Sequence, residues 1–335
     1  MKRIFKKITA ILLSVLVLPI FLTKVLAEDN EKQIGERELE AIERIMQGFE
    51  GFAESIDISD LNIERGAMPS IFATATKNTP YLFYVDKKLT YTYRTGGGVI
   101  KVIPKYNMSK SEAERAIDLC KAEVKKMADL AMAGESELQR LLLAHDLICY
   151  RYKYDLSLEN NNVYKFIKEE KGTCQGYTWT YMAVLRQMGI ECEYVASDTI
   201  EHIWLRVKID GEWYNSDVTW DDPVWNENSG APISRRHVLF SDKKADKDGY
   251  LDRYGASLNK CTSEKYDNTD LSSELFPNHA LGDIDHDGAT TLFDLVKFLR
   301  DEILCSICAD YDGDLILTEK DAELLREHLL TNEYE

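Results

Sequence analysis

The sequence predicts an α+β protein that ends in a small all-α unit. Three observations carry this prediction. Apolar residues recur at helical spacing in several segments before residue 190, apolar and polar residues alternate on both sides of a two-residue turn between 202 and 219, and a twelve-residue acidic pattern occurs twice after residue 281. With 335 residues, of which 44% are hydrophobic, the chain has room for one sizeable domain and one small one.

The first 27 residues have the pattern of a secretory signal peptide. Four basic residues among the first seven precede an apolar run from 8 to 22, and Ala27 supplies a small residue at the expected cleavage position. Pro19 interrupts this short run and Lys24 ends it, which disfavours the alternative of a retained membrane anchor. We therefore expect a secreted, extracellular protein whose mature chain has no membrane anchor.

Removal of this segment would change the formal net charge from −17 to −22, because the segment carries five basic residues and no acidic one. Such an acidic chain repels nucleic acid phosphates and anionic membranes. We therefore expect neither nucleic acid nor a membrane surface among its partners.

Residues 28–268 are predicted to form the main domain. The elements expected in its first half are a helix at 29–54, strands between 81 and 103, and helices at 109–130 and 136–152. The triple glycine at 96–98 is expected to be a hairpin turn, because no helix follows it as a phosphate-binding loop would require. His145 lies on the apolar stripe of its helix and is interpreted as a buried structural residue rather than a catalyst.

Cys174 is expected in the first turn of a helix. The apolar residues behind it recur at helical spacing until Gly189, and Thr173 directly in front of it is a suitable N-cap. The positive end of the helix dipole stabilises a thiolate at this position, and a nearby imidazolium would stabilise it further. Cys174 is therefore a candidate nucleophile, with a buried, inert cysteine as the alternative.

His202 and Asp217 are expected to lie on one face of a β-hairpin. The strand that begins near His202 leads to Asp210 and Gly211, the commonest kind of two-residue hairpin turn, and the chain then returns as a second strand. With this turn Trp204 lies opposite Asp217, so His202 and Asp217 are diagonal neighbours roughly 5.5 to 8 Å apart at Cβ. A three-residue loop would place Asp217 on the opposite face.

Aromatic residues are concentrated in the same region. All five tryptophans lie between the expected Cys174 helix and the residues after the hairpin: Trp179, Trp204, Trp213, Trp220 and Trp225. Such a concentration is typical of an apolar cleft wall that excludes water from a reactive intermediate. A large aromatic core is the alternative.

Three segments of this region resemble the transglutaminase-like superfamily, whose members are related to papain-like folds. They are Gly-Thr-Cys-Gln-Gly-Tyr at 172–177, Glu-His-Ile-Trp at 201–204 and Asp-Val-Thr-Trp-Asp-Asp-Pro at 217–223. The resemblance covers roughly residues 50–268, with its core at about 130–245. It implies a papain-like arrangement in which helices pack on an antiparallel sheet.

The resemblance also implies a role for each member of a Cys-His-Asp triad. Cys174 would be the nucleophile, His202 the general base and then the general acid, and Asp217 the carboxylate that orients the imidazole. The backbone N–H of Cys174 would be one donor of the oxyanion hole, and the second donor is not identified. No cofactor is expected for catalysis. The substrate would be a protein or peptide, with peptidase or amidase activity favoured over cross-linking.

Two alternatives remain open for the same three residues. In the first, the fold is retained as a catalytically silent binding or structural module. In the second, Cys174, His202 and Asp217 are zinc ligands. A cysteine at a helix start argues against zinc, since that position favours thiolate chemistry.

After a polar linker at 269–280, the chain repeats a calcium-loop pattern. The loops 283–294 and 310–321 start 27 residues apart, and each has carboxylates at positions 1, 3, 5 and 12 and leads into a helical pattern. Oxygen ligands at alternating positions, completed by the position-7 carbonyl, suit a hard cation such as Ca²⁺. The predicted ligands are Asp283, Asp285, Asp287, Ala289, Thr291 and Asp294 in loop 1, and Asp310, Asp312, Asp314, Ile316, Thr318 and Asp321 in loop 2. An acidic, solvated tail is the alternative.

Residues 281–335 resemble a type I dockerin. The resemblance implies two bound Ca²⁺ ions and, as partner, a cohesin module of a cellulosomal scaffold protein. Positions 10 and 11 of the loops, which in dockerins tend to recognise the cohesin, are Leu292–Phe293 and Glu319–Lys320, so one binding orientation is expected to dominate. Loop 2 has Leu315 at position 6, where the sharp turn favours glycine, so it is expected to bind Ca²⁺ more weakly or in a shifted frame.

Dockerins usually accompany carbohydrate-cleaving enzymes, but no pair of carboxylates in this chain stands out as acid and nucleophile. Polysaccharide degradation is therefore expected of the host complex, and action on protein of this chain.

The chain has seven cysteines, so one is left over if six form disulfides, and Cys174 is then the natural free thiol. Whether the others pair stays open. It also stays open for the Cys305-Ser-Ile-Cys308 segment between the two loops, which suits either a local disulfide or two thiols.

Overall fold

The computed structural model describes residues 35–77, 79–132, 134, 136–222, 234–251, 253–255, 259–269, 271, 282–284, 289–300, 303, 306–309, 311 and 317–332. These residues form helices, antiparallel strand pairs and one short parallel strand pair, so the predicted mixed architecture is confirmed. The chain divides into two compact units, one with residues up to 107 and 254–258, the other with 108–253 and 259–335. The predicted signal peptide and nearly all of the predicted linker lie outside the described residues. Within the described ranges, no helix is both long enough and apolar enough to cross a membrane.

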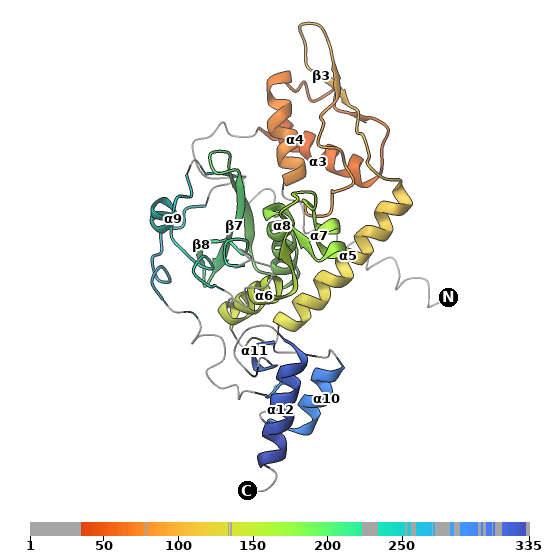
Figure 1. Cartoon of the computed structure of the whole chain (residues 1–335). Coiled ribbons are helices and arrows are strands. Elements are labelled where there is room, and N and C mark those ends of the chain that lie inside the picture. Colours follow the sequence, from red (N-terminus) through yellow and green to blue (C-terminus); the bar gives the residue numbers. More distant parts are fainter. Residues whose placement is uncertain are drawn as a thin grey trace, which may run out of the picture. The chain divides into compact units, whose positions relative to one another are not determined.

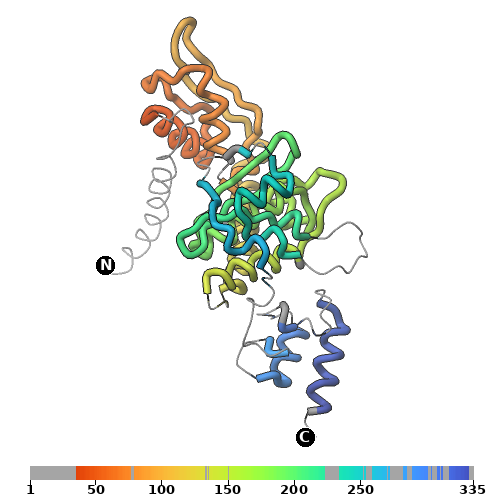
Figure 2. The backbone as a smooth tube through the Cα atoms, turned by 90° about the vertical axis from the view of Figure 1, so that its left-hand side faces the viewer, coloured from red at the N-terminus to blue at the C-terminus, as the bar shows by residue number. Residues whose placement is uncertain are grey.

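The first unit contains helices and an antiparallel sheet. Its elements are α3 (Glu36–Glu50), β1 (Ile56–Asp57), the 3₁₀ turn η1 (Arg65–Ala67), α4 (Met68–Lys77), β2 (Tyr91–Tyr93), β3 (Val99–Val102) and β9 (Tyr254–Gly255). Helix α3 packs on α4, and β3 lies between β1 and β2. The β2–β3 hairpin extends past these helices (Figures 1 and 2), and Gly96 in its turn has a φ of 72°. The predicted glycine turn is therefore confirmed.

Of the strands predicted between residues 81 and 103, the one expected at 82–85 does not form. The chain turns at residues 82–85 and makes only an isolated bridge between Val85 and Tyr106. Aromatic packing replaces strand pairing here, because Phe52 stacks on Tyr84 at 4.8 Å and on Tyr106 at 4.6 Å between ring centroids.

The second unit is built around helix α8 (Cys174–Gln187). Helix α8 packs against α5 (Lys110–Ala131), α6 (Glu137–Arg151), α7 (Val163–Glu169) and the strands β6 (Cys192–Ser197) and β7 (His202–Ile209). In Figure 1, α8 lies between β7 and α5. Ser109 and Ser136 cap α5 and α6 by accepting a hydrogen bond from the backbone N–H three residues later. The two helix starts predicted from sequence are therefore confirmed.

The antiparallel sheet of this unit has the predicted hairpin register. Strand β7 lies between β6 and β8 (Glu212–Ser216) and is antiparallel to both. The β7–β8 pairing runs from Ile209 opposite Glu212 to Leu205 opposite Ser216. Both turn residues between the strands have positive φ, at 52° and 86°, as a two-residue type I′ turn requires. Strand β6 was not expected from the sequence.

A short parallel strand pair and two glycines fix the start of α8. Strand β4 (Lys153–Tyr154) pairs with β5 (Lys171–Gly172), which ends two residues before Cys174. A Cβ atom on Gly172 or Gly176 would lie 2.4 or 2.6 Å from the Phe166 ring of α7. These positions therefore need glycine so that α7 can approach α8 this closely.

The C-terminal part of the second unit has a core of its own. Helix α10 (Leu292–Leu299) packs on α12 (Glu319–Asn332), and the short helix α11 (Ser306–Ala309) lies between them in sequence. Its buried core consists of Ile284, Leu295, Ala309, Ala322 and Leu325. The remaining described helix of the unit is α9 (Asp242–Asp248).

Candidate active site

Cys174 is the first residue of α8, as predicted. Thr173 occupies the N-cap position with extended backbone, although its side chain makes no capping hydrogen bond. Its backbone N–H donates to the carbonyl of Asn160 at 2.9 Å, which ties the start of the helix to the preceding loop. The Cys174 thiol is partly exposed. It is therefore accessible to a substrate while it sits at the positive end of the α8 dipole.

His202 and Asp217 lie on the same face of the hairpin and are in contact. The His202 ring opens β7 and is 6% exposed, and its Nε2 atom lies 2.6 Å from Oδ2 of Asp217. Strand β8 ends at Ser216, so Asp217 follows directly after it in the predicted register. The geometric expectation drawn from the two-residue turn is thus met.

The Asp217 carboxylate is held by further donors that the sequence did not indicate. Its Oδ1 atom accepts hydrogen bonds from the backbone N–H groups of Thr219 at 3.0 Å and Trp220 at 3.3 Å. Its Oδ2 atom also accepts from the hydroxyl of Tyr250 at 2.9 Å. Tyr250 is 33 residues away in sequence, so no local motif points to it.

Cys174 lies close enough to the His202 ring to raise its pKa, so the three predicted residues belong to one site. Burial lowers the pKa of His202, but the charge and hydrogen bond of Asp217 and the contact with Cys174 raise it more, so the pKa rises to about 10. Because Nε2 is bound to Asp217, Nδ1 is the ring nitrogen left for Cys174. A ring that is protonated at neutral pH stabilises a thiolate beside it.

Aromatic rings surround the imidazole. Trp220 stacks on His202 with 5.0 Å between ring centroids and 15° between planes, and Trp204 lies 5.9 Å from it at 18°. Trp204 is buried, whereas Trp220 is 40% exposed. Two of the tryptophans expected to form an apolar wall therefore do border the candidate site, while Trp225 lies outside the described residues.

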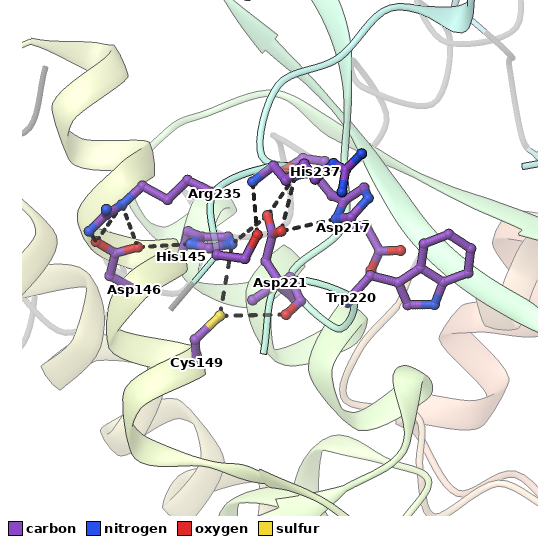
Figure 3. A network of polar contacts seen from close by, with 12 residues as sticks. His145, Asp146, Cys149, Asp217, Trp220, Asp221, Arg235 and His237 are labelled. Atoms are coloured by element: carbon purple, nitrogen blue, oxygen red, sulfur yellow. Dashed lines mark hydrogen bonds and ion pairs between the residues drawn. The ribbon is translucent and has the colours of Figure 1, made fainter. Parts of the chain in front are cut away.

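A second polar network includes Asp221, which follows Asp217 by four residues in the sequence. Figure 3 shows the His145 ring between two carboxylates, with Asp146 Oδ1 2.9 Å from Nδ1 and Asp221 Oδ2 3.3 Å from Nε2. Arg235 binds Asp146 at 2.6 Å, and His237 Nδ1 lies 3.0 Å from Asp221. These contacts attach the chain after Asp217 to helix α6.

The charges of this network support one another. Burial lowers the pKa of His145, but the adjacent Cys149, Asp146 and Asp221 raise it well above its usual value. Burial raises the pKa of Asp221, yet hydrogen bonds from His145 and His237 hold it below its usual value. His145 is fully buried with a partner at each ring nitrogen, as expected for a structural residue.

The described cysteines are not joined in disulfides. Six cysteines are described, and all are free thiols, namely Cys120, Cys149, Cys174, Cys192, Cys261 and Cys308. Cys305 lies outside the described residues.

In the part of the chain that the structure describes, no group of three or more His, Cys, Asp or Glu side chains is arranged to hold a metal ion. The zinc interpretation of the triad therefore has no geometric support.

The predicted calcium loops are described in part. The predicted ligands within the described residues are Asp283, Ala289, Thr291 and Asp294 of loop 1 and Thr318 and Asp321 of loop 2. The other six, Asp285, Asp287, Asp310, Asp312, Asp314 and Ile316, lie outside them, as does Leu315.

The described ends of the two loops repeat each other. The Asp294 carboxylate accepts hydrogen bonds from the backbone N–H groups at positions 2 and 9 of its loop, both at 2.7 Å. The Asp321 carboxylate does the same in the second loop, both at 2.8 Å. Both side chains are fully buried. Position 12 therefore has the same buried carboxylate and the same backbone hydrogen bonds in both predicted loops.

Comparison with known proteins identifies the fold of the site. Residues 125–218 match the model of the Transglutaminase-like superfamily. This segment carries Cys174, His202 and Asp217, so the transglutaminase-like core expected from the sequence is found there. No curated protein matches the chain.

Solved structures with partial similarity include a protein named as a TGase, at 14% identity and a TM-score of 0.30, over 40% of this chain and 44% of that one. A presumed cysteine protease from Cytophaga hutchinsonii matches at 14% identity and a TM-score of 0.25, over 39% of this chain and 61% of that one. A presumed protease from Parabacteroides distasonis matches at 14% identity and a TM-score of 0.25, over 42% of this chain and 36% of that one. The chain thus spans less than two thirds of each of these proteins.

Proposed function

We propose that this chain is a secreted thiol acyl-transfer enzyme that acts on carbonyl groups of proteins or peptides. The observation that carries the proposal is the His202 ring, which binds Asp217 through Nε2 at the start of β7 and whose pKa the nearby Cys174 raises. The three groups come from a helix start, from the first residue of β7 and from the residue directly after β8, inside the segment that matches the transglutaminase-like superfamily. A thiol, an imidazole and a carboxylate in this order of contact form the set that nucleophilic acyl transfer needs.

In the proposed reaction, the Cys174 thiolate attacks the carbonyl carbon, a C–S bond forms, and the electron pair of the C=O double bond moves to the oxygen. When the tetrahedral intermediate collapses, the C–N bond breaks and the leaving amine takes a proton from His202. This step leaves a thioester on Cys174 and a neutral imidazole. The imidazole then accepts a proton from water, which attacks the thioester and releases the carboxylic acid and the Cys174 thiolate.

Asp217 orients the imidazole throughout this cycle. Its carboxylate is fixed by two backbone N–H groups and the Tyr250 hydroxyl, so it cannot rotate away from the ring. The stacked Trp220 covers one face of the imidazole. Together these contacts keep Nε2 bound to the carboxylate, which leaves Nδ1 for proton transfer with Cys174.

We propose hydrolysis rather than cross-linking as the outcome. Water requires no binding site of its own, whereas cross-linking needs a second site that holds an amine. The proposed enzyme would therefore release a carboxylic acid even when a primary amine is present. Incorporation of a fluorescent primary amine into an added protein, in preference to hydrolysis, would favour cross-linking instead.

The acyl-enzyme itself provides the test of the proposed function. Incubation with p-nitrophenyl acetate should release one equivalent of nitrophenolate in a rapid phase and leave an acetyl group on Cys174, which peptide mass spectrometry locates. Cys174→Ala should abolish both signals, and Cys192→Ala, which removes a buried thiol of the same unit, should leave them intact. If no acetyl group is found on Cys174, the chain is the catalytically silent module rather than an enzyme.

We also propose that residues 281–335 form a type I dockerin that binds two Ca²⁺ ions and a cohesin of a cellulosomal scaffold. The repeated hydrogen bonds of Asp294 and Asp321 and the packing of α10 on α12 support a twofold loop-helix repeat. Leu292 and Phe293, at positions 10 and 11 of loop 1, are 64% and 74% exposed. Two such exposed apolar side chains suit a protein partner, whereas Glu319 and Lys320 of loop 2 are charged.

A further inference from the structure

Acyl transfer places a negative charge on the carbonyl oxygen of the tetrahedral intermediate, and this charge needs at least two hydrogen-bond donors. The Cys174 backbone N–H at the start of α8 can supply one donor. We propose that the hydroxyl of Tyr154 is the second donor of the oxyanion hole. This inference rests on the proposed acyl transfer at Cys174 and names one further catalytic residue for it.

Strand pairing places the backbone of Tyr154 next to the residues that directly precede the nucleophile. Tyr154 ends β4 and pairs in parallel with Gly172 of β5, two residues before Cys174. The adjacent backbone N–H of Asp155 donates to the Gly172 carbonyl at 2.8 Å. The Thr173 N–H donates to the carbonyl of Asn160, in the loop that follows β4. The backbone of Tyr154 is thus tied to the residues that lead into the first turn of α8.

Ring packing directs the Tyr154 side chain to the same face of α8 as the thiol. The Tyr154 ring stacks on the Tyr177 ring, with 6.4 Å between centroids and 22° between planes. Tyr177 lies three residues after Cys174, and residues three apart in a helix lie on the same face. Tyr177 itself is fully buried against Phe166, so it forms a rigid support for the Tyr154 ring.

The Tyr154 hydroxyl has the properties of a donor to an oxyanion. Burial raises the pKa of Tyr154, and the charges of Cys174 and Asp155 raise it further, so the hydroxyl keeps its proton at neutral pH. The effect of Cys174 also shows that the two side chains are close enough to interact electrostatically. No residue in the described ranges is hydrogen bonded to this hydroxyl, and the side chain is only partly buried, so a substrate oxygen can reach it.

In the first step of the reaction, the C–S bond forms and the C=O electron pair becomes a lone pair on oxygen. The Cys174 N–H and the Tyr154 O–H donate to that oxygen without transferring a proton. When the intermediate collapses, the C=O bond forms again, the leaving group departs, and both hydrogen bonds weaken. Tyr154 therefore acts in the transition state and not on the resting thiol.

Two reagents that react with the same sulfur distinguish a role of Tyr154 in the transition state from a role in positioning the resting thiol. Acetylation of Cys174 by p-nitrophenyl acetate generates an oxyanion, whereas alkylation by iodoacetamide displaces iodide at carbon and places no charge on a carbonyl oxygen. Tyr154→Phe keeps the stacked ring and removes only the hydroxyl. We expect it to slow acetylation by about 100-fold to 1,000-fold and to change the alkylation rate by less than about twofold.

The matched control is Tyr152→Phe, two residues earlier, whose hydroxyl lies 4.0 Å from the sulfur of Met127 and whose ring stacks on Phe166. It should leave both rates unchanged. If Tyr154→Phe slows both reactions equally, Tyr154 positions the thiol, and if it slows neither, the hydroxyl is a bystander; either result overturns the inference. A parent protein in which neither reagent modifies Cys174 overturns the proposed function and this inference with it.

Discussion

The ring of His202 is fixed from three directions, and this arrangement determines its charge. Asp217 binds Nε2 at 2.6 Å, Trp220 stacks on one face, and Cys174 interacts electrostatically with the ring. Because the ring is buried, it would be neutral at pH 7 without these neighbours. The charge of Asp217 is therefore the main reason that the pKa of His202 rises.

This raised pKa predicts how stability changes with pH. His202 has a pKa of about 10 in the folded state and an ordinary value of 6.5, so the folded state binds the proton more tightly. The contribution of protonated His202 to the free energy of unfolding is complete below about pH 6.5 and is lost as the pH rises towards 10. We expect the free energy of unfolding, measured by urea denaturation from pH 6 to 10, to fall on the order of a few kcal/mol more in the parent than in His202→Ala.

His145 contributes a change of the same sign, since its pKa is also raised, and it is present in both proteins. The difference between parent and variant therefore reports on His202. If the free energy of unfolding changes with pH equally in the parent and in His202→Ala, His202 carries no extra proton in the folded state.

At the scale of elements, the β7–β8 turn sets which side chain meets His202. Each strand residue alternates between two faces, so one added turn residue shifts the register and moves Asp217 to the other face. The pairing of Ile209 with Glu212 shows that the two-residue turn is the one present.

Lengthening this turn should therefore separate the base from its carboxylate. We expect a glycine inserted after Gly211 to slow acetylation of Cys174 by p-nitrophenyl acetate by roughly 100-fold or more, because the imidazole loses its orienting partner. A glycine inserted after Gly97, in the β2–β3 turn, is the control and should have no effect. An unchanged acetylation rate in the first variant, with a circular dichroism spectrum like that of the parent, would contradict the role given to Asp217.

The sequence predicted those parts of the site that follow from local rules. The contact between His202 and Asp217 follows from counting residues across a two-residue turn, and the place of Cys174 follows from helical spacing behind it. Tyr250 could not be found in this way, because it reaches Asp217 across 33 residues.

The network around His145 and strand β6 were missed for related reasons. Arg235 and Asp146, which form an ion pair, are 89 residues apart. Every residue of β6 is buried, so this strand lacks the alternation of apolar and polar residues that marks a half-buried strand. Both features are consequences of tertiary packing, which local patterns do not record.

At the scale of the whole molecule, the proposed dockerin would join the catalytic unit to a larger assembly through calcium. We expect calorimetry of the mature chain with CaCl₂ to show two binding events of unequal affinity, with the weaker one in loop 2 because Leu315 replaces the turn glycine. Asp294→Ala should remove the tighter event and Asp321→Ala the weaker one. Equal affinities would contradict the assignment of loop 2 as the weaker site, and no calcium binding would contradict the dockerin proposal.

The central claim is that Cys174 is an activated nucleophile paired with His202, and its alkylation rate tests this claim most directly. The rate of iodoacetamide incorporation at Cys174 is measured at pH 7 by mass spectrometry in the parent protein and in His202→Ala. We predict that the parent reacts at least about tenfold faster, because the imidazolium stabilises the attacking thiolate. Equal rates in the two proteins would show that His202 does not activate the sulfur and would contradict the account.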